Sequence, residues 1–159
     1  MTTHHEDVLQ FHNTFAVKSA WQDSGRIDPE VVALRKKLIE EEVLEELFPA
    51  MERFKLFPSP ENLTEVADAM IDVVYFIIGG AVALELPWEE LWNEVQRSNM
   101  AKVQADGTIH RREDGKILKP ADWTPPDLFS IILEWGTDRA VRQNVELADS
   151  YAVTRVKKG

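Results

Sequence analysis

The chain has 159 residues, the length of one ordinary domain that can bury a hydrophobic core. Its formal charge of −10 provides no overall attraction for nucleic acid or an anionic membrane, so neither is expected as a partner. The absence of cysteine excludes a disulfide, a zinc–thiolate site and a cysteine nucleophile.

The first ten residues, MTTHHEDVLQ, carry no targeting pattern. They lack the basic and apolar regions of a signal peptide, so we expect a cytoplasmic protein. A first short helix follows, because Val8, Phe11 and Phe15 repeat at helical spacing.

A second, longer helix begins at Asp28 and Pro29. Asp28 is an N-cap acceptor and Pro29 suits the first helical position. We expect this helix to run to about Phe54 and to end before Pro58.

Ser59 and Pro60 repeat the start signal for a third helix, which we expect to reach Leu84. Its longest apolar run, 73–84, has 12 residues, whereas a membrane-spanning helix needs about 20. We therefore predict a buried core helix. A fourth helix begins at Pro87 and carries one apolar stripe formed by Trp88, Leu91, Trp92 and Val95, which we assign to helix–helix packing.

The chain becomes polar after Met100. Residues 108–110 and 116–118 can pair as a small hairpin around the Asp-Gly turn at 114–115. A fifth helix is expected from about Pro126 through Trp135. The prediction is an all-α antiparallel bundle, with one domain at 1–136 and a C-terminal extension at 137–159.

The second helix contains LRKKLIEEEVLEELF (34–48), five of whose residues are glutamates. At about 100° per residue, Glu41 and Glu45 fall within the apolar stripe of Leu34, Leu38 and Phe48, and Glu42 falls at its edge. Glu40 and Glu46 point elsewhere and are expected to be solvent charges.

Three carboxylates of the third helix, Glu65, Asp68 and Asp72, share one edge of an otherwise apolar helix with Tyr75 and Gly79. Close carboxylates in an apolar setting need cations, either basic side chains or metal ions. The basic residues of the two helices, none of which we place on the Glu41/Glu45 stripe, are Arg35, Lys36, Lys37, Arg53 and Lys55.

All-oxygen ligation suits Mg²⁺ or Mn²⁺, and we favour a metal site over a solvated helix edge. A di-iron bundle is excluded because no histidine follows a glutamate of the acidic helices by three residues. His12 is expected to be a packed or capping residue. The chain also lacks a P-loop and a G-x-G-x-x-G motif.

Several segments together resemble the all-α nucleoside triphosphate pyrophosphohydrolases, the MazG-like and phosphoribosyl-ATP pyrophosphohydrolase-like proteins. Glu41-Glu42-x-x-Glu45 is followed on the next helix by an E-x-x-D element. The other matching segments are FHNTFAV (11–17), EVADAMIDVVYFIIGGA (65–81) and EVQRSNMAKVQADGTIHRREDGKILKPADWTPPDL (94–128).

The resemblance implies Mg²⁺-dependent cleavage of a nucleoside triphosphate between the α and β phosphorus, with two or three ions and Mn²⁺ as a possible substitute. It implies a homodimer or homotetramer. Carried over by position, Glu41, Glu42 and Glu45 would be metal ligands, and Glu42 would orient or deprotonate the water.

On the third helix, Asp72 matches the family aspartate, but Ala69 stands where its E-x-x-D would need glutamate. The literal motif is Glu65-x-x-Asp68. We therefore rank Asp72 first as a ligand and Asp68 second, with Glu65 outside them.

Substrate contacts are expected from two groups of side chains. Those proposed for phosphate or sugar are Arg97, Asn99 and Lys102, with Lys116 and Lys119 acting across a subunit boundary. Those proposed as a flat wall for the base are Phe11, Phe15, Trp21 and Tyr75.

The sequence leaves two functions open. The first is a (d)NTP pyrophosphohydrolase for nucleotide-pool control, with a dUTP-like or dGTP-like substrate and a cellular or phage role. The second is a non-catalytic helical oligomerisation or regulatory module. The retained carboxylates favour the enzyme, since an acidic binding module has no need of them.

Overall fold

The computed structural model describes residues 1–22 and 25–142, and residues 137–142 by their backbone alone. The regular elements of the described residues are all helical, with two isolated β-bridges and no strand among those residues. This confirms the all-α prediction. The chain divides into two compact units, Met1–Leu86 and Pro87–Gly159, each described by itself below.

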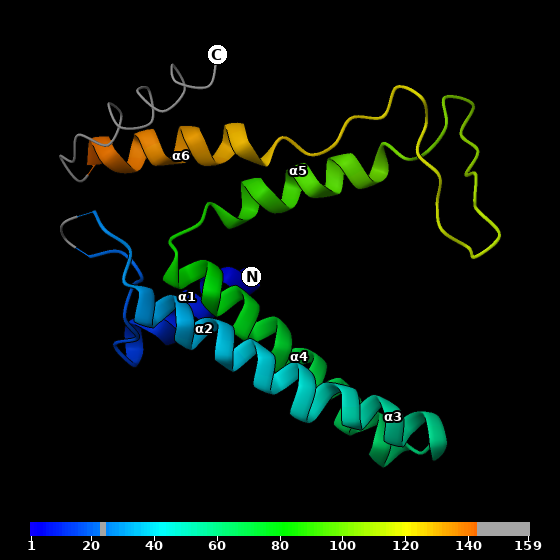
Figure 1. The fold of residues 1–159 in the computed structure, drawn as a ribbon, viewed down its shortest axis with the longest axis horizontal. Coiled ribbons are helices and arrows are strands. Elements are labelled where there is room, and N and C mark those ends of the chain that lie inside the picture. The colour runs from blue at the N-terminus through cyan, green and yellow to red at the C-terminus, as the bar shows by residue number, and fades with distance from the viewer. Residues whose placement is uncertain (23–24, 143–159) are drawn as a thin grey trace. The chain divides into compact units, whose positions relative to one another are not determined.

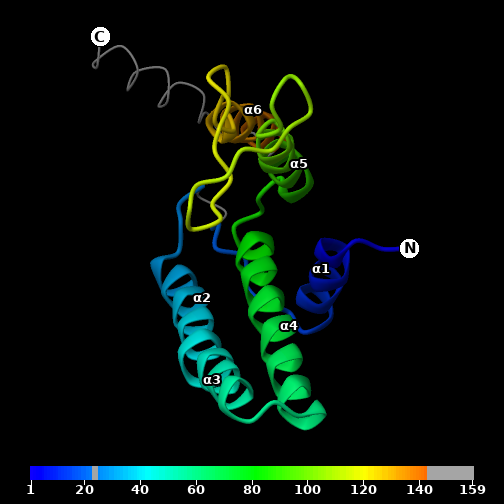
Figure 2. The same ribbon diagram turned by 90° about the vertical axis from the view of Figure 1, so that its right-hand side faces the viewer.

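The first unit is built around one long central helix. Its elements are α1 (His4–Thr14), α2 (Pro29–Glu41), the π-helical segment η1 (Glu42–Leu47), α3 (Phe48–Leu56) and α4 (Pro60–Ala83). The segments α2, η1 and α3 form one continuous rod that runs antiparallel to α4, while α1 packs on α4 as well (Figure 2). A short turn at 57–59 joins the rod to α4.

The helix starts follow the local sequence. Asp28 caps α2 by accepting the backbone N–H of Glu30 at 3.0 Å, as its N-cap signal predicts. Ser59 caps α4 by accepting the N–H of Asn62 at 3.2 Å. Thr3 and Glu6 form a reciprocal capping box at the start of α1.

A π-helical segment interrupts the rod between α2 and α3. The N–H of Phe48 donates to the carbonyl of Val43, five residues back instead of four. Pro49 lies two residues after the end of this segment, and it has no N–H and a ring that would clash with the carbonyl of an α-helical turn before it. We attribute the widened turn to this proline, which the sequence pattern had not flagged.

By length and composition alone α4 could cross a membrane, since an 18-residue window has a mean hydropathy of 1.8. Half of that window is buried within the structure, and the core helix of a soluble protein meets the same test. The buried part lies toward its C-terminal end, where Ala83 packs with Ala20 and Val31. Val66 and Ala69 are buried as well, whereas other apolar side chains of α4, such as Ile71 and Val74, are exposed on this single chain.

The second unit contains α5 (Trp88–Met100) and α6 (Leu128–Arg142), which pack on each other (Figure 1). The predicted hairpin forms only a single bridge, between Arg111 and Ile117, with Gly115 at φ 83° in its turn. The N–H of Leu118 donates to the carbonyl of His110 at 2.8 Å. The domain boundary predicted at 136 stays a prediction, and residues 143–159 lie outside the described residues.

Candidate functional site

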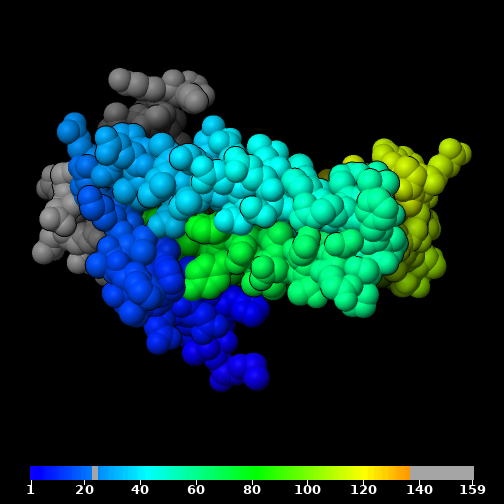
Figure 3. Space-filling model, turned by 90° about the horizontal axis from the view of Figure 1, so that it is seen from below, coloured from blue at the N-terminus to red at the C-terminus, as the bar shows by residue number. Residues whose placement is uncertain are grey.

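A cavity of about 500 Å³ opens between the rod and α4 in the first unit. Figure 3 shows the two lying side by side along one face of the molecule. The walls of the cavity carry five carboxylates and one guanidinium. The lining residues are Glu42, Glu46, Ala50, Arg53, Glu65, Asp68, Ala69 and Asp72.

The cavity joins the two acidic helices that the sequence singled out. Glu42 comes from the first residue of η1, and Asp72 comes from the middle of α4. Because the helices run antiparallel, each further turn along one helix faces an earlier turn of the other. Asp68 and Glu65 therefore lie deeper along the rod, toward Arg53.

The carboxylates are not balanced by basic side chains at the Glu42 end. Burial raises the pKa of the Glu42 carboxyl, and so do the negative charges of Asp72, Glu46 and Glu41 nearby. At the other end, Arg53 donates from Nε and Nη2 to Oε2 of Glu65, at 2.9 and 2.7 Å. Glu65 is thus neutralised within the protein, whereas Glu42, Glu46 and Asp72 form no ion pair with any described residue.

Four of the six predicted ligands line the cavity, but the face of the rod differs from the one predicted. Leu34 and Phe48, which defined the stripe of Glu41 and Glu45, are 50% and 52% exposed on this chain. The face turned to α4 is the one about 100° away, which carries Glu42.

Glu46 was predicted as a solvent charge; it is exposed but lines the cavity. Glu41 and Glu45 do not line the cavity. The sequence pattern placed no basic residue of the two helices on the stripe of Glu41 and Glu45, but the structure pairs one of them with Glu41. Lys37, one helical turn earlier, pairs with Glu41 at 3.2 Å. The roles of Glu41 and Glu45 as ligands stay predictions.

The donor chemistry of the cavity fits a hard divalent cation. Carboxylate oxygens are the ligands that Mg²⁺ and Mn²⁺ prefer, and Glu42 lies near Asp72 and Glu46, which form no ion pair with a described residue. In the part of the chain that the structure describes, no three such side chains are grouped as a metal site requires. Binding would therefore draw the carboxylates of the two helices together by side-chain rotation.

An aromatic cluster formed by Phe11, Phe15 and Tyr75 lies between α1 and α4. The ring centroids of Phe11 and Phe15 are 4.5 Å apart, and Tyr75 meets Phe11 edge-on at 5.7 Å. Phe11 and Phe15 remain exposed, as a flat contact surface requires. Trp21 makes a different contact, in which its indole N–H donates to the carbonyl of Leu84 at 2.8 Å.

Two polar residues beside this cluster were not assigned to the site from the sequence. His12 is 5% exposed, and Arg35 has a buried Nε atom without a hydrogen-bond partner. Both lie against Gly79, where an added Cβ would be 3.3 Å from His12 Nε2 and 3.4 Å from Arg35 Nη1. The signal for Arg35 was its spacing, because it precedes Glu42 by seven residues and so shares its helix face.

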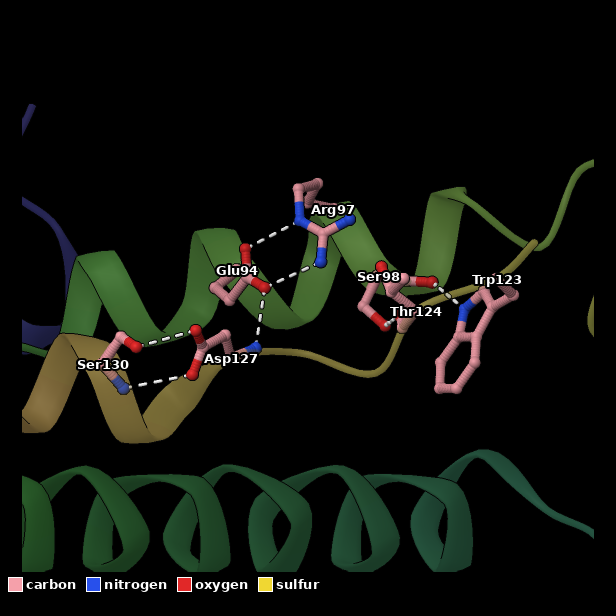
Figure 4. Close-up of polar contacts among 7 residues, drawn as sticks. All are labelled: Glu94, Arg97, Ser98, Trp123, Thr124, Asp127 and Ser130. Carbon is pink, nitrogen blue, oxygen red and sulfur yellow. Dashed lines mark hydrogen bonds and ion pairs between the residues drawn. The ribbon is translucent and has the colours of Figure 1, made fainter. Parts of the chain in front are cut away.

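In the second unit, most of the predicted phosphate contacts already interact with other residues of the protein. Arg97 forms two hydrogen bonds of 2.7 Å with Glu94, whose Oε1 also accepts the backbone N–H of Asp127 at 2.8 Å (Figure 4). Asp127 in turn accepts from the N–H and hydroxyl of Ser130 in the first turn of α6. These contacts join α5 to the start of α6.

Lys102 donates to Asn99 at 2.6 Å, and the ammonium of Lys119 lies 3.5 Å above the Trp123 ring. Lys116 has an exposed side chain, and its backbone N–H donates to Asp114. The phosphate-binding roles given to Arg97, Asn99, Lys102, Lys116 and Lys119 stay predictions.

The sequence model of the phosphoribosyl-ATP pyrophosphohydrolase family matches residues 8–99, which is more than half of the chain. The chain belongs to this family. No curated protein gives a significant match. The matched range begins in α1 and ends in α5, and it includes every residue that lines the cavity.

Membership in the phosphoribosyl-ATP pyrophosphohydrolase family makes the chain an all-α hydrolase of phosphoric anhydrides that acts on nucleotides. Members of the family are typically metal-dependent, in keeping with the oxygen-rich cavity described above. The resemblance drawn from the acidic motifs is thereby confirmed at the level of the family.

Proposed function

We propose that the protein is a Mg²⁺-dependent nucleoside triphosphate pyrophosphohydrolase. It cleaves a (d)NTP between the α and β phosphorus to give (d)NMP and pyrophosphate, for nucleotide-pool control in the cytoplasm. The observation that carries the proposal is the cavity between the rod and α4, where Glu42 lies near the carboxylates of Glu46 and Asp72 and none of the three forms an ion pair with a described residue.

Glu42 and Asp72 are the principal ligands in this proposal, and Asp68 is the next. Two or three Mg²⁺ ions, or Mn²⁺ in their place, would neutralise the triphosphate and lower the pKa of the attacking water. Without them the acidic cavity would repel a substrate of the same sign. The pairing of Glu65 with Arg53 supports a place for Glu65 outside the ligand set.

Glu42 orients the water and accepts its proton as the oxygen attacks phosphorus. The α–β bridging P–O bond then breaks, and pyrophosphate leaves. A carboxylate whose pKa is raised by its surroundings is a stronger base at neutral pH than an ordinary glutamate, which supports this role.

A pyrophosphate-release screen across canonical and modified (d)NTPs, with Mg²⁺ and with Mn²⁺, tests the proposal. We expect turnover of at least one nucleotide that depends on the metal. Glu42→Gln is expected to lower kcat by 10²-fold or more with the helical circular dichroism spectrum intact. Unchanged activity in Glu42→Gln would remove the water-activating role.

The rival proposal is a non-catalytic helical module. It is separated from the enzyme by thermal unfolding with Mg²⁺ and a nonhydrolysable triphosphate. The enzyme is expected to be stabilised by the two together, because a ligand that binds only the folded state raises stability. No shift in the midpoint would favour the module.

The third ligand on the rod is contested between Glu45, which the family resemblance suggests, and Glu46, which lines the cavity. Glu45→Gln and Glu46→Gln, assayed for the Mg²⁺ concentration that gives half-maximal activity, decide between them. The residue that ligates is the one whose loss raises that concentration.

A further inference from the structure

Arg35 carries a charge that nothing in the described part of the chain neutralises. It forms no ion pair with any described residue, and its Nε–H is buried without an acceptor. Burial lowers the pKa of Arg35, but a guanidinium remains charged in proteins. A buried donor without an acceptor is unfavourable, so a ligand that supplies acceptors there would gain binding energy.

The residues next to Arg35, His12 and Gly79, carry no negative charge that would neutralise it. His12 lies beside it against Gly79, and burial, together with the Arg35 charge, lowers the pKa of His12, which keeps the imidazole neutral. Gly79 gives both side chains room by lacking a Cβ. The place therefore presents one guanidinium and one neutral imidazole.

An exposed aromatic surface adjoins these two residues. The Phe11 ring centroid is 6.4 Å from that of His12, and Tyr75 lies edge-on to Phe11. A planar ring stacked on this surface would carry its polar edge toward the neighbouring side chains. Aromatic surfaces of this kind hold nucleobases by stacking.

The distance to the carboxylate cavity matches the length of a nucleoside. Glu42 interacts with Asp72 across the two helices, and Arg35 meets Gly79 across the same helices. On each helix, the two pairs are separated by seven residues, which is roughly 10 Å along the helix axis. A nucleotide whose phosphates lie at the carboxylates would bring its base to Arg35.

The hydrogen-bonding character of the site distinguishes the bases. Arginine has donors and no acceptor. Guanine presents two acceptors, O6 and N7, to which arginine binds in a bidentate manner, whereas adenine pairs N7 with a donor amino group. Cytosine presents a donor amino group, and thymine presents one acceptor.

We infer that Arg35, with His12 beside it, binds the O6/N7 edge of a guanine base and selects guanine nucleotides as substrates. The inference rests on the proposed pyrophosphohydrolase function and narrows its substrate. It decides between the purine and pyrimidine alternatives on the side of dGTP-like nucleotides. Arg35 acts here as a specificity-determining residue.

The first experiment varies the base on the unmodified protein. Pyrophosphate release is measured for dGTP, dITP, 7-deaza-dGTP, dATP and dUTP with Mg²⁺. The expected kcat/KM is similar for dGTP and dITP, which share O6 and N7. It is lower by about tenfold or more for 7-deaza-dGTP, which lacks N7, and for dATP and dUTP.

The second experiment removes the guanidinium. Arg35→Gln is expected to reduce the ratio of kcat/KM for dGTP over dATP toward one, a change in selectivity that loss of fold alone would not produce. The matched control is Lys36→Gln on the same helix, where Lys36 is an exposed side chain paired with Glu40. The control is expected to keep the ratio of the unmodified protein.

The outcomes separate the two proposals. No hydrolysis of any nucleotide would overturn the enzyme function itself. Hydrolysis without preference for dGTP and dITP, or an unchanged ratio in a folded Arg35→Gln, would overturn only the role of Arg35. Where Arg35→Gln does not fold, equal rates for dGTP and 7-deaza-dGTP in the unmodified protein still refute the inference.

Discussion

Asp72 stands on the middle turn of α4 and faces Glu42 across the cavity. The charge of Asp72 helps to raise the pKa of the Glu42 carboxyl, so the ionised pair is poorly tolerated unless a cation lies near it. The protein thus maintains an unfavourable charge arrangement at the place where the proposed reaction needs metal.

Replacing Asp72 by Asn tests this arrangement. In metal-free buffer the variant is expected to be at least as stable as the unmodified protein, because one like charge is removed. Activity is expected to fall by about 10²-fold, and the Mg²⁺-induced rise in thermal midpoint is expected to shrink. Glu40→Gln, a solvent-exposed change on α2, is the control. A full Mg²⁺ response in Asp72→Asn would contradict the assignment.

Glu94 provides a pH dependence in the second unit. Its hydrogen bonds from Arg97 and from the Asp127 N–H lower the pKa of Glu94 from 4.5 to about 2. Because the folded-state pKa is depressed, the contribution to stability is present above about pH 4.5 and is lost as pH falls toward 2.

Urea unfolding of the unmodified protein and of Glu94→Gln, measured at pH 6 and at about pH 3, checks this. The variant is expected to be less stable at pH 6, and the difference is expected to narrow at the lower pH. A difference that stays constant with pH would mean that Glu94 does not contribute through its charge.

At the scale of elements, α4 carries two adjacent glycines with different surroundings. A Cβ on Gly79 would press on His12 and Arg35, whereas a Cβ on Gly80 would meet no atom within 4 Å. Glycine within a helix is less favourable than alanine by about 1 kcal/mol.

Gly80→Ala is therefore expected to stabilise the protein by up to about 1 kcal/mol. Gly79→Ala is expected to gain less or to destabilise, because His12 must move. Urea midpoints of the two variants measure the difference. Equal gains at both positions would show that the contact with His12 is loose.

Much of the helical framework could be predicted from sequence, because helix starts depend on local capping residues. Asp28 and Ser59 cap the helices that they were expected to start. The face of the rod that meets α4 could not be predicted in the same way. The apolar stripe of Leu34 and Phe48 suggested one face, and it is exposed on this chain.

The sequence predicted which helices form the candidate site, but it did not predict every residue that lines it. The acidic residues of α4 were placed correctly on one edge, because an uninterrupted α-helix has a fixed periodicity. The rod does not, since Pro49 follows a π-helical turn. Arg35 was passed over because a single arginine on a helix is an ordinary sequence feature, and its lack of a partner is visible only in three dimensions.

At the scale of the whole molecule, the first unit exposes many large apolar side chains on the rod and α4. They include Leu34, Leu44, Phe48, Met51, Met70, Ile71, Val74 and Ile77. Monomeric proteins rarely leave contiguous apolar patches of large size uncovered. A second copy of the chain is the occupant that the proposed homodimer or homotetramer would place there.

Size-exclusion chromatography with light scattering is expected to give a mass of at least two chains. Ile71, 66% exposed, is the position at which Ile71→Lys is expected to shift the protein toward the monomer with its helical spectrum retained. A monomeric mass for the unmodified protein would contradict the proposal that a second copy of the chain covers these apolar side chains.

The π-helical segment changes the direction of the side chains after it relative to those before it, compared with an uninterrupted α-helix. The part before Glu42 sets which side chains meet the C-terminal half of α4, and the part after Leu47 sets the position of Arg53 opposite Glu65. The segment accommodates one residue more than an α-helix of the same rotation, so deleting a single residue within it would restore an ordinary α-helix and leave Arg53 in phase with Glu42. A deletion between Phe48 and Arg53, in the α-helical part, would instead turn Arg53 by about 100° and move it away from Glu65 while leaving each helix intact.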